Sequence, residues 1–156
     1  MNLDRKDQKI LEIVQSNNLT PHREIADRVG LSTAAVTRRL GRLRKQGYIK
    51  ADVSVLNQKL LNRSLVIISQ VVADSEKLEE RDAMRDAFMR CPQIQQCHYV
   101  TGEADFILIF NVADMGEYES LTRELFFSSG NVKRFTTFVS METVKSGQHV
   151  VIKTGN

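Results

Sequence analysis

The stretch HREIADRVGLSTAAVTRRLG, residues 22–41, decides the fold of the N-terminal part of this chain. Its apolar residues recur at helical spacing on both sides of Gly30, the residue type best suited to the positive φ of a tight turn. Ala26 is small enough for the two flanking helices to approach closely, and Ser32 is placed to begin the second of them. The spacing therefore predicts a helix-turn-helix.

A first helix is expected before this motif, with Asp4 as its N-cap, so that three short helices occupy residues 3–46. For the second helix, Thr20 is expected as the N-cap and Pro21 as the first helical residue. Residues 48–56, YIKADVSVL, alternate roughly as a strand does. A short strand pair after three helices predicts a wing.

The remainder of the chain is rich in predicted strands. We expect strands, with helices between them, in the order β-α-β-β-α-β over residues 64–73, 76–90, 94–101, 105–112, 115–127 and 132–141. The first of these helices should turn inward Leu78, Met84, Ala87 and Phe88. The order predicts a ferredoxin-like sheet with both helices on one face, in an α+β protein. The uncovered face would expose apolar residues, which predicts at least a dimer.

The resulting domain organisation is a winged helix-turn-helix over residues 1–56, a linker over 57–63 and a second domain over 64–156. Charge follows this division. Residues 1–63 hold 13 Lys and Arg against 6 Asp and Glu, a net charge of +7, whereas the remainder carries −4. A basic helix-turn-helix is typical of proteins that bind double-stranded DNA, although a solvated basic face without a partner would show the same charge.

The buried positions of the third helix determine which of its side chains face outward. We expect exposed DNA-contacting residues at the start of this helix, namely Ser32, Thr33, Ala34, Thr37 and Arg38. Thr and Arg suit base edges in the major groove. Residues placed to contact the DNA backbone are Arg39, Arg42 and Lys50, together with Arg44 and Lys45.

Other chemistry finds little support in the sequence. His22, His98 and His149 are far apart, the glycines are scattered, and Cys91 and Cys97 have no matching partners, so we expect no catalytic residues, metal site or cofactor. Both cysteines are expected as reduced thiols. A charged N-terminus and the lack of a long apolar run predict a cytoplasmic protein without a membrane partner.

Taken together, the motifs resemble the Lrp/AsnC family of transcriptional regulators. The resemblance spans nearly the whole chain and rests on segments in a matching order: LDRKDQKIL at residues 3–11, VGLS at 29–32, VTRRLGRLRKQGYI at 36–49, CPQIQQCHYVTGEADF at 91–106 and VSMETVK at 139–145. Two departures are present. The chain has SSGNV at 128–132 where the family often has Pro-Gly-Val, and Pro21 where the family often has a Ser or Thr cap.

The resemblance implies a ligand-sensing second domain, often called the RAM domain, with dimers that commonly assemble into octamers as tetramers of dimers. It also implies a small effector, typically an amino acid, near the turn at residues 100–105. From this segment it implies as effector contacts Tyr99, Thr101, Gly102 and Asp105. Asp105 can meet an ammonium and the turn amides a carboxylate, although a hairpin turn at Gly102 capped by Asp105 needs no ligand.

Two other functions stay open at this point. A nucleoid-type architectural protein would use the same DNA-binding domain with little sequence preference and no effector. A ligand-handling enzyme of ferredoxin-like fold could keep a vestigial helix-turn-helix. Competition between the upstream DNA and random DNA separates the first from a sequence-specific regulator, and the effect of Arg38→Ala on DNA affinity and its salt dependence tests the second.

Overall fold

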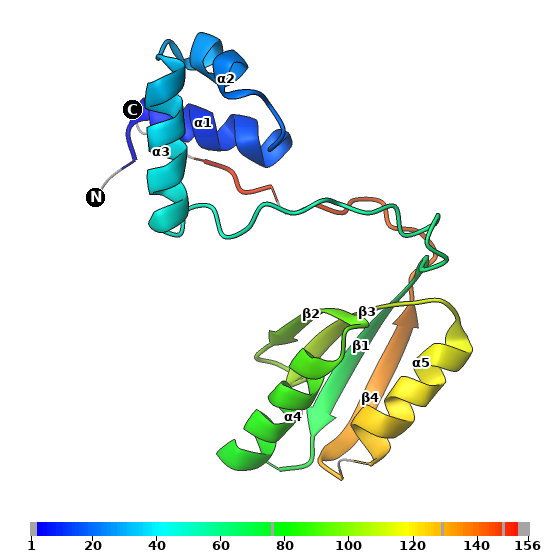
Figure 1. Ribbon diagram of the computed structural model, residues 1–156. Helices are drawn as coiled ribbons and strands as arrows, with labels where there is room; N and C mark the ends of the chain where they lie inside the picture. Colours follow the sequence, from blue (N-terminus) through cyan, green and yellow to red (C-terminus); the bar gives the residue numbers. More distant parts are fainter. Residues whose placement is uncertain (1–2, 76, 129, 148, 153–156) are drawn as a thin grey trace. The chain divides into compact units, whose positions relative to one another are not determined.

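The computed structural model describes residues 3–75, 77–128, 130–147 and 149–152, and the chain forms two compact units (Figure 1). The first unit holds the chain up to Val55 together with the segment from Ser146 onward, and the second is Leu56–Lys145. This division differs from the predicted one, which gave the last residues to the second domain. The returning segment joins the first unit because the Val150 amide and carbonyl exchange two hydrogen bonds of 3.1 Å with the side-chain amide of Gln15, and Ile152 packs on the helical core.

The first unit is built from three helices, as predicted: α1 (Arg5–Ser16), α2 (His22–Val29) and α3 (Thr33–Lys45). Each contributes a stripe of apolar side chains to one small core. Its buried members are Ile10, Leu11, Ile25, Ala26, Val29, Val36, Leu40 and Leu43. The i, i+4, i+7 spacing on α3 places three of these on one side, so the opposite side of that helix remains available to a partner.

The helix starts follow the predictions in two cases out of three. Asp4 caps α1 and Ser32 caps α3, whose Ala35 amide donates to the Ser32 hydroxyl at 3.2 Å. The prediction for α2 was wrong: Pro21 is the N-cap, and Thr20 is buried and donates its hydroxyl to the Asn17 carbonyl instead. Proline satisfies this position because it has no amide proton that needs an acceptor.

The predicted strand of a wing over residues 48–56 was also wrong. The described residues after α3 form a turn and then an irregular segment, in which Val53 and Val55 are exposed. Alternating residues form a stable strand only beside a partner strand, and the part of the first unit that the structure describes contains no strand to pair with.

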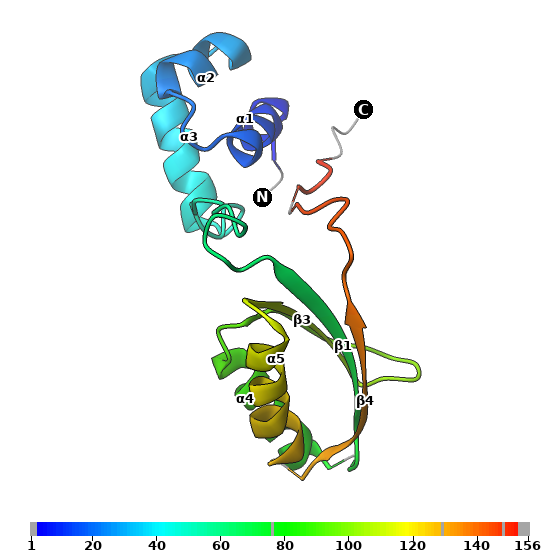
Figure 2. The ribbon, with the colours of Figure 1, turned by 90° about the vertical axis from the view of Figure 1, so that its right-hand side faces the viewer.

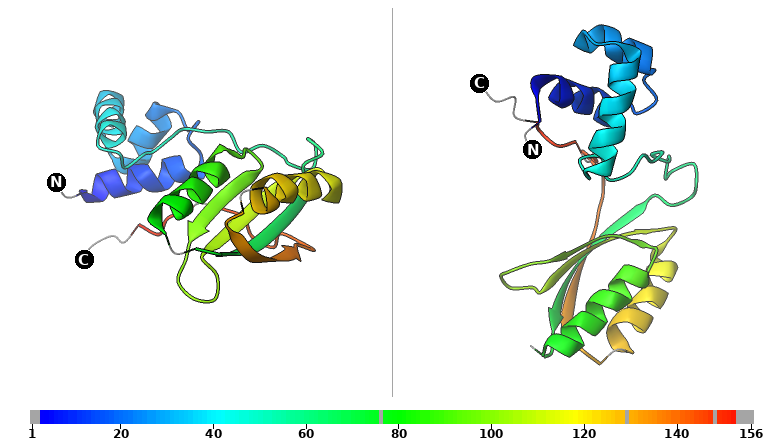
Figure 3. Two further views of the ribbon diagram at one scale, coloured as in Figure 1. Left: turned by 90° about the horizontal axis from the view of Figure 1, so that it is seen from below. Right: turned by 60° about the vertical axis from the view of Figure 1, so that its left-hand side comes forward.

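The second unit is a four-stranded antiparallel sheet in the order β2-β3-β1-β4. Its strands are β1 (Leu65–Ala73), β2 (Ile94–Tyr99), β3 (Phe106–Val112) and β4 (Val132–Val139). Two helices follow β1 and β3, namely α4 (Leu78–Arg90) and α5 (Met115–Thr122), and α5 continues as a π-helical turn, η1 (Arg123–Phe127). Both helices cover the same face of the sheet, which confirms the predicted ferredoxin-like order (Figures 2 and 3).

The core of this unit lies between the sheet and its helices. Buried side chains from every second position of β1 and β3 pack there, and Phe88 of α4 meets Phe106 of β3 edge to face with ring centroids 5.4 Å apart. Met84 and Phe88 face inward as predicted, but Leu78 is 60% exposed. The prediction failed there because Leu78 is the first residue of α4 and lies before the part of the helix that reaches the sheet.

The other face of the sheet has a row of apolar side chains across its strands. Ile109 pairs with Ile68, and Ile68 pairs with Phe138, which is 48% exposed. In the next row Ile107 pairs with Gln70, and Gln70 with Thr136. No helix of the described second unit covers this face (Figure 2).

The predicted linker is partly built into the second unit. Asn111, which is buried, donates its amide to the Gln58 side chain at 3.2 Å and to the Arg63 carbonyl at 2.7 Å. Arg63 also donates to both carboxylate oxygens of Glu117 on α5, at 2.5 and 2.6 Å. Residues 57–63 therefore form an ordered entry to β1 rather than a free connector.

Candidate DNA-binding surface and effector site

The helix-turn-helix has the geometry that its sequence predicts. Gly30 ends α2 in the left-handed conformation, with φ of 65° and ψ of 52°, and the Leu31 amide returns to the Ala26 carbonyl at 3.0 Å. The Gly30 carbonyl accepts a 2.8 Å hydrogen bond from the Lys6 ammonium of α1. The turn is thus held from both sides, which fixes where α3 begins.

The first half of α3 presents the predicted surface. The residues exposed here are Ser32, Thr33, Ala34, Thr37 and Arg38, and Gly41 leaves its backbone exposed on the same helix. Among the described residues, Arg38 has no hydrogen bond or ion pair, so its guanidinium is available to a ligand. Lys50, beyond the end of α3, is likewise exposed.

The sequence interpretation missed a contact of His22 with this surface. The Thr37 hydroxyl donates to the Thr33 carbonyl at 3.0 Å, so its oxygen is left to accept from His22 Nδ1 at 2.8 Å. His22 thereby joins the start of α2 to the exposed face of α3. A histidine at a helix start gives no sequence signal for such a contact, because its partner lies 15 residues away.

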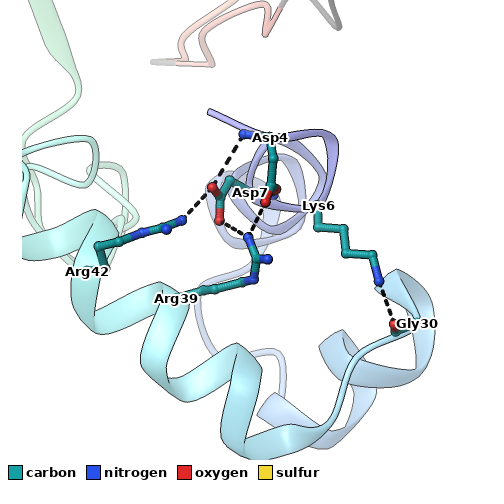
Figure 4. A network of polar contacts seen from close by, with 6 residues as sticks. All are labelled: Asp4, Lys6, Asp7, Gly30, Arg39 and Arg42. Carbon is teal, nitrogen blue, oxygen red and sulfur yellow. Dashed lines mark hydrogen bonds and ion pairs between the residues drawn. The ribbon is translucent and has the colours of Figure 1, made fainter. Parts of the chain in front are cut away.

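Arg39 and Arg42 have a different setting from Arg38 (Figure 4). Arg39 donates to Asp4 at 2.6 Å and to Asp7 at 2.8 Å, and Arg42 donates to the second oxygen of Asp7 at 2.5 Å. The pKa of Asp4 is lowered first by the hydrogen bond from the Asp7 backbone amide and then by the hydrogen bond from Arg39. The carboxylates of Asp4 and Asp7 in turn raise the pKa of Arg39. The expected contacts of Arg39 and Arg42 with the DNA backbone stay predictions. The same holds for Arg44, whose guanidinium pairs with Asp52 at 2.9 Å.

The predicted effector residues gather at the hairpin between β2 and β3. Tyr99 ends β2 and is 57% exposed, Gly102 has φ of 129° in the turn, and Thr101 beside it is exposed. Arg81 of α4, which the sequence interpretation missed, donates to the Tyr99 hydroxyl at 3.0 Å and lies 5.1 Å from its ring centroid. The tyrosine is therefore held in place by a cation-π contact as well as a hydrogen bond.

Asp105 has a structural role in this hairpin. Its Oδ2 accepts a 2.8 Å hydrogen bond from the Ala73 amide at the end of β1, where the pairing with β4 shifts register. Its own amide donates to the Val71 carbonyl at 2.9 Å, and its carbonyl accepts from Val100 at 2.9 Å. The carboxylate thus joins the hairpin to β1.

The cysteines Cys91 and Cys97 are free thiols, as predicted, and burial raises the pKa of Cys97. Within the described ranges, no group of three or more His, Cys, Asp and Glu side chains is placed to hold a metal ion. No described helix combines the length and the apolar character that a membrane span requires. The departure at 128–132 falls partly outside the described residues, and its Gly130 has φ of 69°.

A basic helix-turn-helix followed by a separate four-stranded sheet domain is the architecture of a two-domain DNA-binding regulator. Comparison with known proteins agrees. A model of winged helix-turn-helix DNA-binding domains matches residues 3–50, and a model of the Lrp/AsnC ligand binding domain matches residues 66–150. The chain belongs to the Lrp/AsnC family, and it is a DNA-binding regulator, not an enzyme.

Relatives match over most of the chain. An uncharacterised HTH-type transcriptional regulator from Sinorhizobium fredii is 42% identical over 146 residues, covering 94% of this chain and 86% of the relative. The leucine-responsive regulatory protein of Escherichia coli is 33% identical over 152 residues, covering 97% and 93%. Among solved structures, a transcriptional regulator from Neisseria meningitidis in complex with L-Met superposes with a TM-score of 0.90 at 23% identity, covering 96% of this chain and 97% of that one.

Proposed function

We propose that the N-terminal half of α3 reads base edges in the major groove, through Ser32, Thr33, Ala34, Thr37 and Arg38, while Lys50 meets the DNA backbone. The observation that carries this proposal is the exposed and unpaired guanidinium of Arg38 beside exposed hydroxyls on a helix whose other side is buried. Arg can donate two hydrogen bonds to a guanine, and Thr can contact several bases. Because its proposed target is chromosomal DNA, we propose that the protein acts in the cytoplasm.

The test is competition binding between the DNA upstream of the protein's own gene and random duplex DNA. A specific regulator prefers its site by about a thousandfold or more, whereas an architectural protein shows little preference. Arg38→Ala should reduce this preference, because a bidentate contact contributes about 1–3 kcal/mol of discrimination. An unchanged preference in Arg38→Ala would exclude this surface as the reader of sequence.

We also propose that the protein is a dimer through the open face of its sheet, and that dimers assemble further, up to an octamer. The row Ile109, Ile68 and Phe138 supports this proposal, because such a surface is costly to leave in water. Two copies related by a two-fold axis would cover each other's row. Each dimer then presents two α3 helices to half-sites separated by whole turns of DNA.

For the effector, we propose an α-amino acid bound at the hairpin by Tyr99, Thr101, Gly102 and Asp105. The complex of the Neisseria regulator with L-Met and the leucine-responsive relatives support this ligand class. An amino acid brings an ammonium, which a carboxylate such as Asp105 can meet, and a carboxylate, which turn amides can meet. The ligand shifts the assembly only as far as its affinity differs between two assembled states.

A thermal-shift panel of amino acids tests this site. A ligand at 100 times its Kd stabilises the folded protein by about 2.7 kcal/mol, which raises Tm by several degrees. The matched variant is Asp105→Asn, because asparagine keeps an oxygen for the Ala73 amide and removes the charge that meets the ammonium. An equal shift in Asp105→Asn, or no shift with any amino acid, would contradict the proposed site.

A further inference from the structure

The carboxylate of Asp7 is buried between α1 and α3. Its side chain is 3% exposed, and its two oxygens accept from two different arginines of α3 (Figure 4). Arg39 Nη1 lies 2.8 Å from one oxygen and Arg42 Nη2 lies 2.5 Å from the other. Two of the basic residues on the helix that faces DNA are thus turned toward the protein itself.

The same carboxylate belongs to the cap of α1. The Asp7 amide donates to Asp4 at 2.7 Å, and the Asp4 amide donates weakly back to Asp7 at 3.4 Å, which forms a capping box. Asp4 adds a second acceptor for Arg39 at 2.6 Å. The start of α1 and the middle of α3 are therefore joined by one connected set of polar contacts.

We propose that Asp7 is a positioning residue for DNA recognition, which keeps Arg39 and Arg42 away from the phosphates and fixes α3 on α1. The electrostatic contacts with DNA then fall to Arg38 and the other exposed cations. This inference rests on the proposed recognition surface of α3. It assigns Arg39 and Arg42 a role inside the protein, in place of the contact with the DNA backbone that their position on the helix predicts.

The charges of the cluster support this assignment. Asp4 and Asp7 balance Arg39 and Arg42, so these four residues add no net charge to the surface that approaches DNA. If either arginine left to bind a phosphate, the buried Asp7 carboxylate would lose one of its two partners, and weakening a buried charge pair costs more than an exposed phosphate contact contributes. DNA is therefore a poor competitor for these two side chains.

Arg42 is paired with Asp7 although its side chain is 38% exposed. Its Nε is buried and has no acceptor among the described residues, so the guanidinium is held through Nη2, which donates to Asp7 at 2.5 Å.

The salt dependence of DNA binding measures how many phosphates the protein neutralises. Each phosphate neutralised changes the slope of log Kd against log salt by about 0.9. The experiment uses the full chain and a fluorescein-labelled duplex of random sequence, titrated at several salt concentrations. On random DNA no fixed guanine faces Arg38, so its guanidinium meets a phosphate there and contributes to the slope. Arg38→Ala and Arg39→Ala are a matched pair, because they remove the same charge from adjacent positions of one helix.

We expect Arg38→Ala to lower the slope by about 0.9 per bound subunit and to leave Tm almost unchanged. Arg39→Ala and Arg42→Gln should lower Tm and leave the slope as it is. A slope lowered equally by all three substitutions would overturn the role of Asp7 while supporting the α3 surface. An unchanged slope and affinity in Arg38→Ala would overturn the surface and this inference together.

Asp7→Asn gives the converse test. Asparagine keeps oxygen and nitrogen atoms at the start of α1 but removes the charge that pairs with the arginines. Arg42 then loses its partner, whereas Asp4 still holds Arg39, so the slope should become steeper by about 0.9 as Arg42 reaches a phosphate and Tm falls. A folded Asp7→Asn protein with the wild-type slope would contradict the inference. If that variant does not fold, Arg39→Ala and Arg42→Gln decide the question.

Discussion

Replacing Glu117 with glutamine should destabilise the second unit by an amount that depends on pH. The pKa of Glu117 lies at about 2 rather than 4.5, first because Arg63 donates to both its oxygens, and then because the Ala113 amide and the Gln93 side chain donate to it as well. These bonds stabilise the ionised form in the folded chain only. The carboxylate therefore links the entry to β1 with the start of α5.

The size of the effect follows from the pKa. At about 1.36 kcal/mol per pH unit, a pKa lowered from 4.5 to about 2 corresponds to about 3 kcal/mol. The Arg63 side chain is 44% exposed, so water screens the pair, and we expect about 1–2 kcal/mol from Glu117→Gln at pH 7. A carboxyl with a lowered pKa stabilises the fold above its unfolded value, so this difference should persist down to about pH 5 and disappear as the pH falls toward 2.

Urea unfolding followed by circular dichroism, at one protein concentration and at pH values from 7 to 3, measures this difference. Glu119→Gln is the matched control, because Glu119 lies on the same helix but its ion pair with Arg123 is exposed on both sides. It should change the free energy of unfolding by little at any pH. A difference between Glu117→Gln and wild type that is equal at pH 7 and pH 3 would refute the reasoning.

Three further predictions concern the dimer, the turn and the cap. Ile68→Asp should convert the dimer to a monomer, measured by light scattering after size exclusion. The control Met89→Asp, at an exposed position of α4, should leave the dimer intact. A dimeric Ile68→Asp protein would place the interface elsewhere. Gly30→Ala should lower the free energy of unfolding by about 1–2 kcal/mol through backbone strain alone, since a Cβ there meets no atom within 4 Å. Gly41→Ala within α3 should instead raise it by about 0.5–1 kcal/mol. Equal Tm changes of one sign in the two variants would contradict this contrast. Ser32→Ala should cost about 1 kcal/mol in urea unfolding through loss of the α3 cap, while Ser32→Asn restores it.

The sequence predicted the features that depend on neighbours along the chain. The buried stripe of α3, the left-handed Gly30 and the order of strands and helices all follow from local spacing and residue type. The wing strand failed because strand formation depends on a partner that local alternation does not reveal. The N-cap at Pro21 failed because Thr20 found an acceptor in Asn17, behind it in the chain.

The sites were predicted less completely, for a related reason. The outward side of α3 follows from periodicity, so Arg38 could be placed correctly on the exposed face. Arg39 and Arg42 are indistinguishable from Arg38 by residue type, and only contacts across more than 30 residues show that they bind Asp7. The Arg81 contact to Tyr99 joins two elements in the same way. Such pairings depend on the packing of helices and strands, which no local pattern contains.

The double engagement of Asp105 limits how an effector can act. Its carboxylate already holds the Ala73 amide, so an ammonium that binds Asp105 must share the carboxylate with β1. The carbonyl of Val71, two residues before Ala73 on β1, accepts a hydrogen bond from the Asp105 amide. The same strand carries Ile68 on the open face of the sheet. A ligand at the hairpin would therefore alter the hydrogen bonds that Asp105 makes to β1, the strand that contributes Ile68 to the proposed subunit interface. Because only a difference in affinity between two assemblies can shift their populations, we expect effector and oligomer to be linked through β1.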